Sequence, residues 1–451
     1  MKLMETIADY AVRQQTAPVP DEVMHHAKRV VIDWFAALMP GAVLEPTPAL
    51  ERALADDIGR GGAILYPSGR RATLRTAALI NATASHVVEF DDIFRDGIIH
   101  PGSPIIGAAL AAAQSANADG ETLLRAVIAG YEIATRIGVT VNPAHYQFWH
   151  TTGTVGTIGA AAAAGMIARL DRMRMAHGLA TSVTMAAGLQ QAFRSDAMSK
   201  PLHAGHAAEA GALAAMAAVE GVTGALDILE GAYGFGQAMS RNCDWAKAVE
   251  GLGELYNITQ MTVKNHGCCG HAFAAIDGIL ALREQYQPEI PDIRRIRIAT
   301  YKTAIDVTGN PKPSTAFEAK FSMPYTVATA LVHGNVRLNA FEPDRLNETR
   351  VRELMERVEL TVDPLLDSAF PAQRAARVSM EMTNGERFEH FQPTRKGDPD
   401  QPLTDQELEE KFMELAGSVI GEAAAQRMLA ELWILDRAQG PLLPVEERRT
   451  A

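Results

Sequence analysis

Histidines are unevenly distributed in this sequence of 451 residues, and nine of the thirteen lie between His86 and His271. Several stand beside glycines and prolines, which is the pattern of turns rather than of helix faces. Turns held by a rigid scaffold are where proteins commonly present catalytic and binding side chains. The distribution therefore indicates a site for proton transfer that is assembled from several short motifs.

The first motif combines carboxylates with histidines. Glu89, Asp91 and Asp92 fall within four residues, shortly after His86 and before a His-Pro-Gly turn that begins at His100. Close like charges raise the pKa of one carboxyl group, which suits general acid–base catalysis. Glu89 and Asp91 are the predicted substrate-binding residues of this motif, and the alternative is that Asp91 and Asp92 cap or solvate a loop.

The second motif places a histidine immediately before a helix. His150 precedes Thr151, Thr152, a glycine and Thr154, and this turn is expected to open a helix. A helix N-terminus presents backbone N–H groups that can cradle a carboxylate, so His150 and Thr151 are candidate site residues. The alternative is that one threonine is an ordinary N-cap and that His150 is partly buried in a loop.

Lys200 begins the third motif, Lys-Pro-Leu-His-Ala-Gly-His. Its ammonium could hold a substrate carboxylate, or act as an acid if burial lowers its pKa. His203 and His206 are three residues apart, a spacing that could serve a metal on a helix. Gly205 and the turn-like start argue against a helix here, so we expect no metal site.

The fourth motif holds a lysine, two histidines and two thiols within residues 264–271. Lys264 could bind an anion, and Cys269 could pair with His266 or His271 as a thiol nucleophile. Adjacent cysteines lack the spacing of a zinc site, and the alternative is a tight structural turn with buried thiols. Tyr325 could donate a hydrogen bond to a substrate oxyanion, although a lone tyrosine is more often anchored in a core.

Two kinds of structure must position these motifs. Residues 1–258 carry apolar side chains at helical spacing, which predicts a large all-α domain. Besides a helix that opens at Pro20–Glu22, the expected helices cover 74–88, 104–116, 120–139, 154–170, 207–220 and 225–231.

The pattern changes near residue 259. Residues 259–400 predict a smaller α+β domain, with alternating strands at 293–301, 358–362 and 378–382 and a hairpin turn at Asn384–Gly385. Residues 393–404 read as a polar, Pro-rich linker. Residues 401–451 return to helix and are expected to pack on the all-α domain.

Composition narrows the function classes. The formal net charge of −12 argues against a nucleic-acid partner, which needs a basic surface. Three cysteines, two of them adjacent, predict no disulfide framework and favour a reducing, cytoplasmic compartment. The apolar runs are far shorter than the roughly 18 residues that span a bilayer, and the N-terminus does not read as a signal peptide, so no membrane partner is expected. Glycine-rich dinucleotide or phosphate loops are absent, and no cofactor is predicted.

Taken in order, six short pieces resemble the MmgE/PrpD family: EFDD with HPGS, GYE, FWHTTGTVG, KPLHAGHAAEAG, KNHGCCGH with AAID, and FSMPYTVATAL. The resemblance covers nearly the whole chain. It implies a large all-α domain closed by the C-terminal segment, a smaller α+β lid domain, a homodimer, and an active site between the domains. It also implies chemistry without a metal or an organic cofactor. The matching positions are Glu89, His100, His150, Lys200, the 264–271 loop and Tyr325.

The family includes 2-methylcitrate dehydratase, cis-aconitate decarboxylase and iminodisuccinate epimerase. Departures from the dehydratase and decarboxylase pattern occur at Glu89, Ile93 and 264–273, and they favour the epimerase-like branch. The prediction is proton abstraction and transfer at the carbon next to a carboxylate of a small di- or tricarboxylate. Lys200 is expected to anchor a carboxylate or act as an acid, and His100 and His150 to transfer protons or bind.

Three alternatives remain. One is a lyase of the dehydratase or decarboxylase type. Another is a metal-dependent hydrolase or lyase that uses His203, His206, Cys269 and His271. The last is a non-catalytic carboxylate-binding protein, which the density of ionisable groups in turns argues against. In the enzymatic interpretation, histidines from the helical domain and the 264–271 loop flank one substrate carbon.

Overall fold

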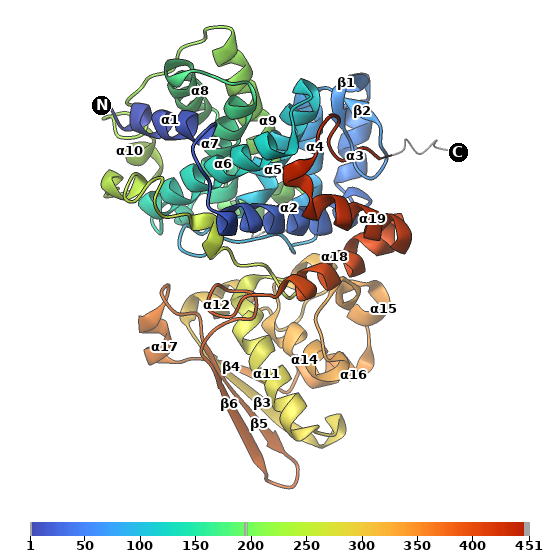
Figure 1. Cartoon of the computed structure of the whole chain (residues 1–451). Helices are drawn as coiled ribbons and strands as arrows, with labels where there is room; N and C mark the ends of the chain where they lie inside the picture. Colours follow the sequence, from blue (N-terminus) through green and yellow to red (C-terminus); the bar gives the residue numbers. More distant parts are fainter. Residues whose placement is uncertain (1, 194, 196, 446–451) are drawn as a thin grey trace. The chain divides into compact units, whose positions relative to one another are not determined.

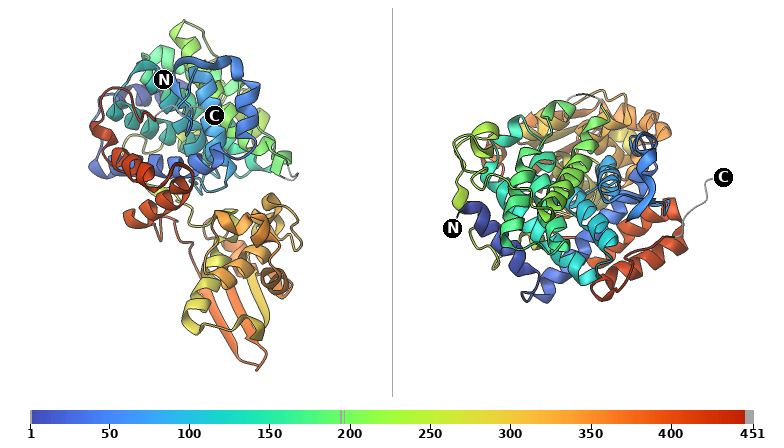
Figure 2. Two further views of the ribbon diagram at one scale, coloured as in Figure 1. Left: turned by 90° about the vertical axis from the view of Figure 1, so that its right-hand side faces the viewer. Right: turned by 90° about the horizontal axis from the view of Figure 1, so that it is seen from above.

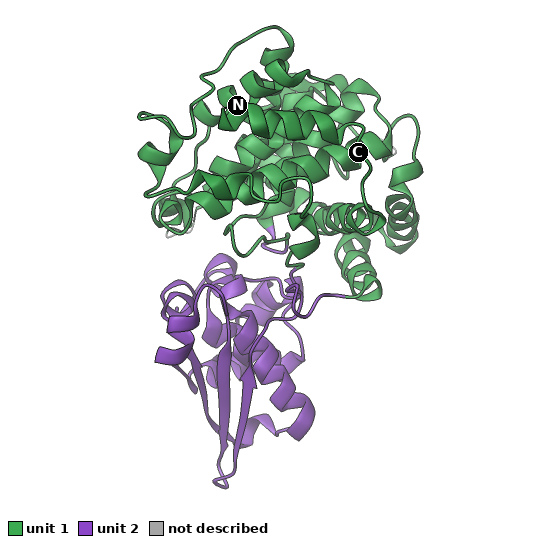
Figure 3. Cartoon of the chain, turned by 60° about the vertical axis from the view of Figure 1, so that its left-hand side comes forward, with its two compact units in different colours: residues 1–87, 91–263, 404–451 green, residues 88–90, 264–403 purple. Residues whose placement is uncertain are grey.

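The computed structural model describes residues 2–193, 195 and 197–445. The chain divides into two compact units, coloured separately in Figure 3. Unit 1 comprises residues 1–87, 91–263 and 404–451, and unit 2 comprises residues 88–90 and 264–403. Most of unit 2 is thus inserted before the last stretch of unit 1. The predicted class, mainly α with a small α+β part, is confirmed.

Unit 1 is a bundle of helices around the buried helix α7 (Figure 1). Every residue of α7 is buried, and most are alanine, glycine or threonine. Side chains this small let α5, α6, α8 and α9 approach α7 closely. The helices of unit 1 are α1 (Leu3–Gln14), α2 (Asp21–Ala42), α3 (Thr47–Ala53), α4 (Leu74–Val87), α5 (Gly102–Ala116), α6 (Gly120–Val141), α7 (Thr151–Ile167), α8 (Arg172–Thr184), α9 (Ser199–Val219), α10 (Phe235–Met239), α18 (Asp405–Ile420) and α19 (Glu422–Trp433).

The C-terminal helices return to unit 1, as predicted. Both α18 and α19 contact α2, and the views in Figure 2 show these red helices beside the blue one. A capping box between Thr404 and Glu407 starts α18. The ammonium of Lys411 on α18 lies 2.5 Å from the carboxylate of Asp33 on α2, and both side chains are buried. This ion pair fixes the register of α18 on α2.

Several features of unit 1 differ from the sequence predictions. Residues 225–231 form turns instead of a helix, because a segment this short between Gly224 and Gly231 is a poor helix nucleus. The helices α1, α3, α8 and α10 were not among the predicted ranges. An antiparallel pair of strands, β1 (Ile58–Ile64) and β2 (Arg71–Ala72), was not predicted.

No single helix among the described residues has the length and apolar character to cross a membrane. One pair, α2 with α3, meets the criteria of length and composition together, but it is bent by 74°.

Unit 2 is built on a four-stranded sheet in the order β4-β3-β5-β6 (Figure 1). β3 pairs parallel to β4 and antiparallel to β5, and β5 and β6 form a hairpin through the predicted turn at Asn384–Gly385. The predicted strands are confirmed. The strands are β3 (Ile293–Thr300), β4 (Val358–Val362), β5 (Ala376–Met382) and β6 (Arg387–Gln392), and the helices are α11 (Phe273–Tyr286), α12 (Lys302–Thr308), α13 (Ala316–Lys320), α14 (Met323–His333), α15 (Pro343–Leu346), α16 (Thr349–Met355) and α17 (Pro364–Ala369).

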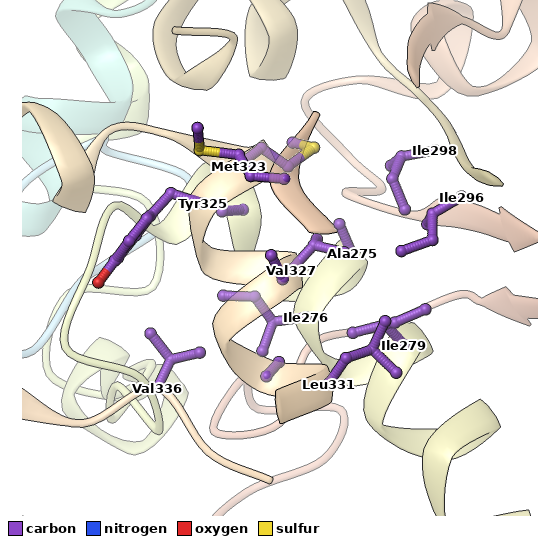
Figure 4. Close-up of a cluster of buried hydrophobic side chains, with 14 of the residues drawn as sticks. Ala275, Ile276, Ile279, Ile296, Ile298, Met323, Tyr325, Val327, Leu331 and Val336 are labelled. Atoms are coloured by element: carbon purple, nitrogen blue, oxygen red, sulfur yellow. The ribbon is translucent and has the colours of Figure 1, made fainter. Parts of the chain in front are cut away.

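The core of unit 2 lies between the sheet and the helices α11 and α14. Figure 4 shows Ile276 and Ile279 of α11 and Val327 of α14 beside Ile296 and Ile298 of β3. Alternate residues of β3 are buried, as the alternating isoleucines predicted. The 264–271 loop leads directly into α11, so this core supports the loop from one side.

The segment predicted as a linker contains no helix or strand but is not a purely solvated connection. Arg395 and Asp398 are buried there and form an ion pair, with Nη2 and Oδ1 2.7 Å apart. Arg395 also donates a hydrogen bond to the carbonyl of Gly270. The segment therefore fastens the end of the 264–271 loop.

Candidate active site

In unit 1, the buried carboxylate of Asp91 contacts the two histidines of the first motif. Its Oδ2 lies 2.7 Å from Nδ1 of His86 and 3.3 Å from Nδ1 of His100, and it accepts a hydrogen bond of 2.9 Å from the hydroxyl of Ser103. His86 lies at the end of α4, and Ser103 lies in the first turn of α5. The carboxylate thus binds three groups of its own unit and is 1% exposed. This arrangement is that of an orienting group, and the predicted role of Asp91 in substrate binding stays a prediction.

Asp92 fixes the backbone that carries these groups. Its carboxylate accepts hydrogen bonds from the N–H of Gly102 and the hydroxyl of Tyr131. Burial, and then the nearby Asp33, raise the pKa of Asp92 to about 7. A Cβ at Gly102 would meet the Tyr131 hydroxyl at 2.7 Å, so only glycine permits this approach. Asp92 therefore anchors the N-terminus of α5 to α6.

His150 stands at the N-cap of α7, and the predicted helix N-terminus is confirmed. Its ring stacks on that of His86, with the ring centres 5.6 Å apart. Its Nδ1 lies 3.1 Å from Nδ1 of His203 on α9. Thr151 is fully buried, and its hydroxyl accepts a hydrogen bond from Asn142, so the structure gives it a partner within the protein. Its predicted role in substrate binding stays a prediction.

The third motif lies on a helix, and the predicted turn-like start is wrong. α9 runs without a break from Ser199 and carries Lys200, His203 and His206. Gly205 is present because α9 lies very close to α4: a Cβ there would meet the hydroxyl of Thr83 at 2.0 Å. Gly205 is therefore required by the close packing of α9 on α4 and does not indicate a turn.

Lys200 faces the same group of side chains. It is 3% exposed, and its ammonium lies 5.1 Å from the centre of the Phe193 ring. The edge-to-face contact of Phe193 with His150, 4.5 Å between ring centres, brings this ring against the histidines as well. Lys200, His100 and His150 are thus brought together with Asp91 in unit 1.

Burial keeps the central imidazoles neutral at neutral pH. It lowers the pKa of His86 to about 3, although Asp91 acts in the opposite direction. It lowers the pKa of His203 to about 4 and that of His150 well below the usual range. A neutral imidazole has the lone pair that a base needs, and a bound polyanion would raise its proton affinity.

One group in the described part of the chain has the geometry to hold a metal ion. His86, Asp91 and His100 offer ligand atoms that lie within 4.8 Å of one another. The same atoms are in hydrogen-bond or ion-pair contact through Asp91. The four residues of the predicted metal alternative do not form such a group among the described residues.

The other predicted residues lie in unit 2. Glu89 adopts a positive φ of 59°, and its carbonyl accepts a hydrogen bond of 2.9 Å from the buried ammonium of Lys264. The Glu89 carboxylate is 3.6 Å from that ammonium. Lys320 donates to the carbonyl of Val88, and burial lowers its pKa to about 8. Two lysines therefore hold the short segment that precedes Asp91.

The loop that follows Lys264 presents an oriented histidine. Nε2 of His266 lies 2.8 Å from the carboxylate of Asp277, which also accepts a hydrogen bond from the N–H of Lys396. Burial raises the pKa of Cys268, so this residue is a neutral thiol. Cys269 is half-buried, and its predicted role stays a prediction.

Two predicted residues have partners inside unit 2. His271 is hydrogen-bonded to the hydroxyl of Tyr301, and burial lowers its pKa to about 3. Tyr325 is fully buried among the apolar side chains of unit 2 (Figure 4). Its hydroxyl donates a hydrogen bond to the carbonyl of Ala340. The structure thus places Tyr325 in the core, the alternative that its sequence context left open. The expectation that groups from both units flank one substrate carbon stays a prediction.

Sequence reasoning missed His86 as a site residue and treated His203 only as a metal ligand. Both could have been found. His203 lies three residues after Lys200 and shares a turn of α9 with it, and His86 lies three residues before Glu89, near the end of α4.

Comparison with known proteins tests the predicted family directly. Residues 5–248 match the MmgE/PrpD N-terminal domain, and residues 266–436 match the MmgE/PrpD C-terminal domain. The chain belongs to the MmgE/PrpD family. The predicted family is confirmed, and so is the prediction of an MmgE/PrpD-type enzyme.

Relatives of this MmgE/PrpD chain are similar over nearly its whole length. The cis-aconitate decarboxylase-like protein oryM of Aspergillus oryzae is 26% identical over 94% of this chain and 92% of its own. The cis-aconitate decarboxylase of Aspergillus terreus is 24% identical over 96% and 92%. The human cis-aconitate decarboxylase is 25% identical over 89% and 85%.

Proposed function

We propose that this MmgE/PrpD protein is a lyase that acts on a small di- or tricarboxylate without an organic cofactor. The observation that carries the proposal is the group of neutral imidazoles of His86, His150 and His203 beside Lys200 in unit 1. The relatives named as cis-aconitate decarboxylases support a lyase rather than the epimerase preferred from the sequence. The shared chemical step is proton transfer at the carbon next to a carboxylate.

The residues divide the chemistry between them. A carbon next to a carboxylate gives up a proton, or loses carbon dioxide, only when the resulting negative charge is stabilised. The Lys200 ammonium supplies positive charge for a substrate carboxylate. His100 and His150 supply proton donors and acceptors, since Asp91 contacts Nδ1 of His100 and His203 contacts Nδ1 of His150. In each imidazole, Nε2 is the atom available for a reacting group.

An epimerase is the second candidate. It needs an acid on the face of the carbon opposite the base, so a second proton-transfer group is required. The His266–Asp277 pair is such an oriented imidazole, and it lies in the loop that departs from the dehydratase and decarboxylase pattern. The His266–Asp277 pair is therefore the observation that supports an epimerase as the second candidate.

A single set of reactions in D2O separates the candidates. The purified full-length protein is incubated with cis-aconitate, 2-methylcitrate and each enantiomer of iminodisuccinate. Carbon dioxide release indicates a decarboxylase, water loss a dehydratase, and enantiomer interconversion with deuterium uptake an epimerase. Absence of deuterium uptake and turnover across a broad panel of di- and tricarboxylates would favour the binding protein instead.

The substitution Lys200→Ala tests whether the Lys200 ammonium binds a substrate carboxylate. We expect kcat/KM to fall by about 100-fold or more, since a buried charged contact to the substrate is lost. Lys247→Ala, which alters an exposed lysine of unit 1, is the matched control. The same variant is assayed for loss of deuterium from an α-deuterated substrate. Loss at the wild-type rate would show that Lys200 takes no part in the mechanism.

Two further expectations accompany the proposal. The family resemblance implies a homodimer, and the cysteine content favours a reducing compartment. Light scattering of the purified protein measures the first, and fractionation of the source cells measures the second.

A further inference from the structure

Two histidines from different helices share one hydrogen-bond contact. Nδ1 of His150 and Nδ1 of His203 lie 3.1 Å apart. Two N–H groups pointing at each other would repel, and two facing lone pairs would leave a buried nitrogen unsatisfied. The contact therefore holds one proton, donated by one imidazole and accepted by the other.

The surrounding backbone makes room for this pair. A Cβ at Gly188 would meet Nδ1 of His203 at 3.3 Å, and a Cβ at Gly153 would meet Cβ of His203 at 3.0 Å. The carbonyl of Gly188 also accepts a hydrogen bond from the N–H of His150. Gly188 and Gly153 thus leave room for the side chain of His203 beside that of His150.

The two histidines differ in their access to water. His150 is 2% exposed, with the edge-on ring of Phe193 and the stacked ring of His86 against it. His203 is partly exposed. Water can therefore exchange protons with His203 more readily than with His150.

We propose that His203 is a positioning and proton-relay residue that acts through His150, carrying protons between His150 and water. This inference rests on the proposed function, and it adds the path by which the reacting proton enters and leaves. His203 itself need not touch the substrate.

The relay conserves protons at each step. In the resting pair, His150 carries hydrogen on Nδ1 and a lone pair on Nε2, while His203 carries hydrogen on Nε2. When Nε2 of His150 takes a proton from carbon, His150 passes its Nδ1 proton to Nδ1 of His203. His203 then releases its Nε2 proton to water, and both tautomers are exchanged.

The reverse sequence supplies a proton to carbon. Water protonates Nε2 of His203, His203 returns its Nδ1 proton to His150, and Nε2 of His150 donates to the carbanion. In a decarboxylation, the electron pair left on carbon after carbon dioxide departs receives this proton. One proton from water is consumed for each carbon dioxide released.

His203→Asn tests the relay, because asparagine can still hydrogen-bond to Nδ1 of His150 but cannot carry a proton through its side chain. His206→Asn is the matched control, since His206 lies one turn further along α9 and contacts the carbonyl of Met185 instead. Both variants are assayed in D2O with cis-aconitate, 2-methylcitrate and both enantiomers of iminodisuccinate.

In His203→Asn we expect kcat to fall by about tenfold or more with KM little changed, as for loss of a proton-transfer group. Deuterium exchange into recovered substrate should fall further than product formation. His206→Asn should match the wild type in both. A His203→Asn protein that keeps the wild-type ratio of exchange to turnover overturns the relay.

A measurement without substrate separates this inference from the proposed function. Nitrogen NMR of protein labelled with 15N-histidine reports a coupling across an N–H···N hydrogen bond. The coupling should be present in the wild type and in His206→Asn and absent in His203→Asn. Its absence from the wild type overturns the shared proton, whereas its presence together with no turnover of any panel compound counts against the proposed function alone.

Discussion

At the scale of residues, the site depends on which atoms the imidazoles leave available. Asp91 contacts the Nδ1 atoms of His86 and His100, so it favours the tautomers whose Nε2 carries the lone pair. The sequence indicated the histidines and carboxylates of this motif, and its prediction that Asp91 binds substrate stays a prediction. Only the fold shows that Asp91 is enclosed by three partners of its own unit. Two of these partners, His100 and Ser103, lie further along the chain, and local sequence does not show that they fold back onto Asp91.

Asp91→Asn tests this orienting role. An amide preserves shape but can donate hydrogen to Nδ1, which favours the wrong tautomer. In a serine protease the same exchange lowers kcat by about 10,000-fold, and we expect a loss of about 1,000- to 10,000-fold here with little change in KM. Steady-state kinetics measure both constants.

Asp96→Asn is the matched control, because this aspartate of the same loop is 62% exposed at its side chain. It should retain wild-type kinetics. If Asp91→Asn instead raised KM and left kcat unchanged, Asp91 would return to the predicted role in substrate binding.

At the scale of elements, small residues let the helices of unit 1 pack closely together. The alanine-rich and glycine-rich pattern correctly predicted closely packed helices at α4, α5, α6 and α7. It failed at the start of α9, where Gly205 and Pro201 resemble a turn. Proline fits the first turn of a helix, and the glycine is required by the contact with α4, a tertiary cause that no local pattern reveals.

Gly205→Ala tests this contact. The added methyl group would overlap the Thr83 hydroxyl and the carbonyl of Leu79, so α9 must move away from α4. Overpacking of this kind typically costs about 1–3 kcal/mol of unfolding free energy, measured by denaturant titration. Activity should fall too, because α9 carries Lys200 and His203.

Gly417→Ala is the control within a helix. Nothing lies within 4 Å of a Cβ at this position in α18. Replacing glycine by alanine there should stabilise the protein by about 0.5–1 kcal/mol. Equal effects of the two substitutions would contradict the packing explanation for Gly205.

At the scale of the whole molecule, composition and periodicity predicted the helical and α+β parts and the return of the C-terminal helices. They could not predict that Val88–Phe90 belongs to unit 2, because three residues carry no periodicity. The partners that hold this segment, Lys264 and Lys320, are more than 170 residues away in the chain. Such pairings depend on tertiary structure.

Buried titratable groups predict how stability depends on pH. Burial lowers the pKa of six histidines, namely His26, His86, His145, His150, His203 and His271. Below the ordinary value of 6.5, the unfolded chain binds protons that the folded chain does not, so these histidines stabilise the fold above pH 6.5 and that contribution is lost on acidification. Burial raises the pKa of Asp92 and Glu132 to about 7, so these two contribute stability at acid pH that is lost as pH rises through 7.

Because the histidines outnumber the two acids, we expect Tm to fall as the pH is lowered from about 6.5 to 4, which a thermal unfolding series will measure. The contribution of Glu132 to the free energy of unfolding is lost as the pH rises from 5 to 8. Glu132→Gln should abolish this decrease, because the group that gains a proton on folding is removed. A Tm that rises steadily from pH 6.5 to 4 would show that the acids dominate.

Unit 1 is discontinuous in the sequence, so it can complete its folding only after unit 2 has been synthesised. The ribosome makes all of unit 2 before it makes α18, so the helix surface of α2 that receives α18 stays uncovered during most of translation. The ion pair between Lys411 and Asp33 can form only after residue 411 has left the exit tunnel. A premature stop codon shortly after residue 403 would therefore spare unit 2 but leave unit 1 without α18 and α19. We expect chaperones to bind this product and proteases to degrade it.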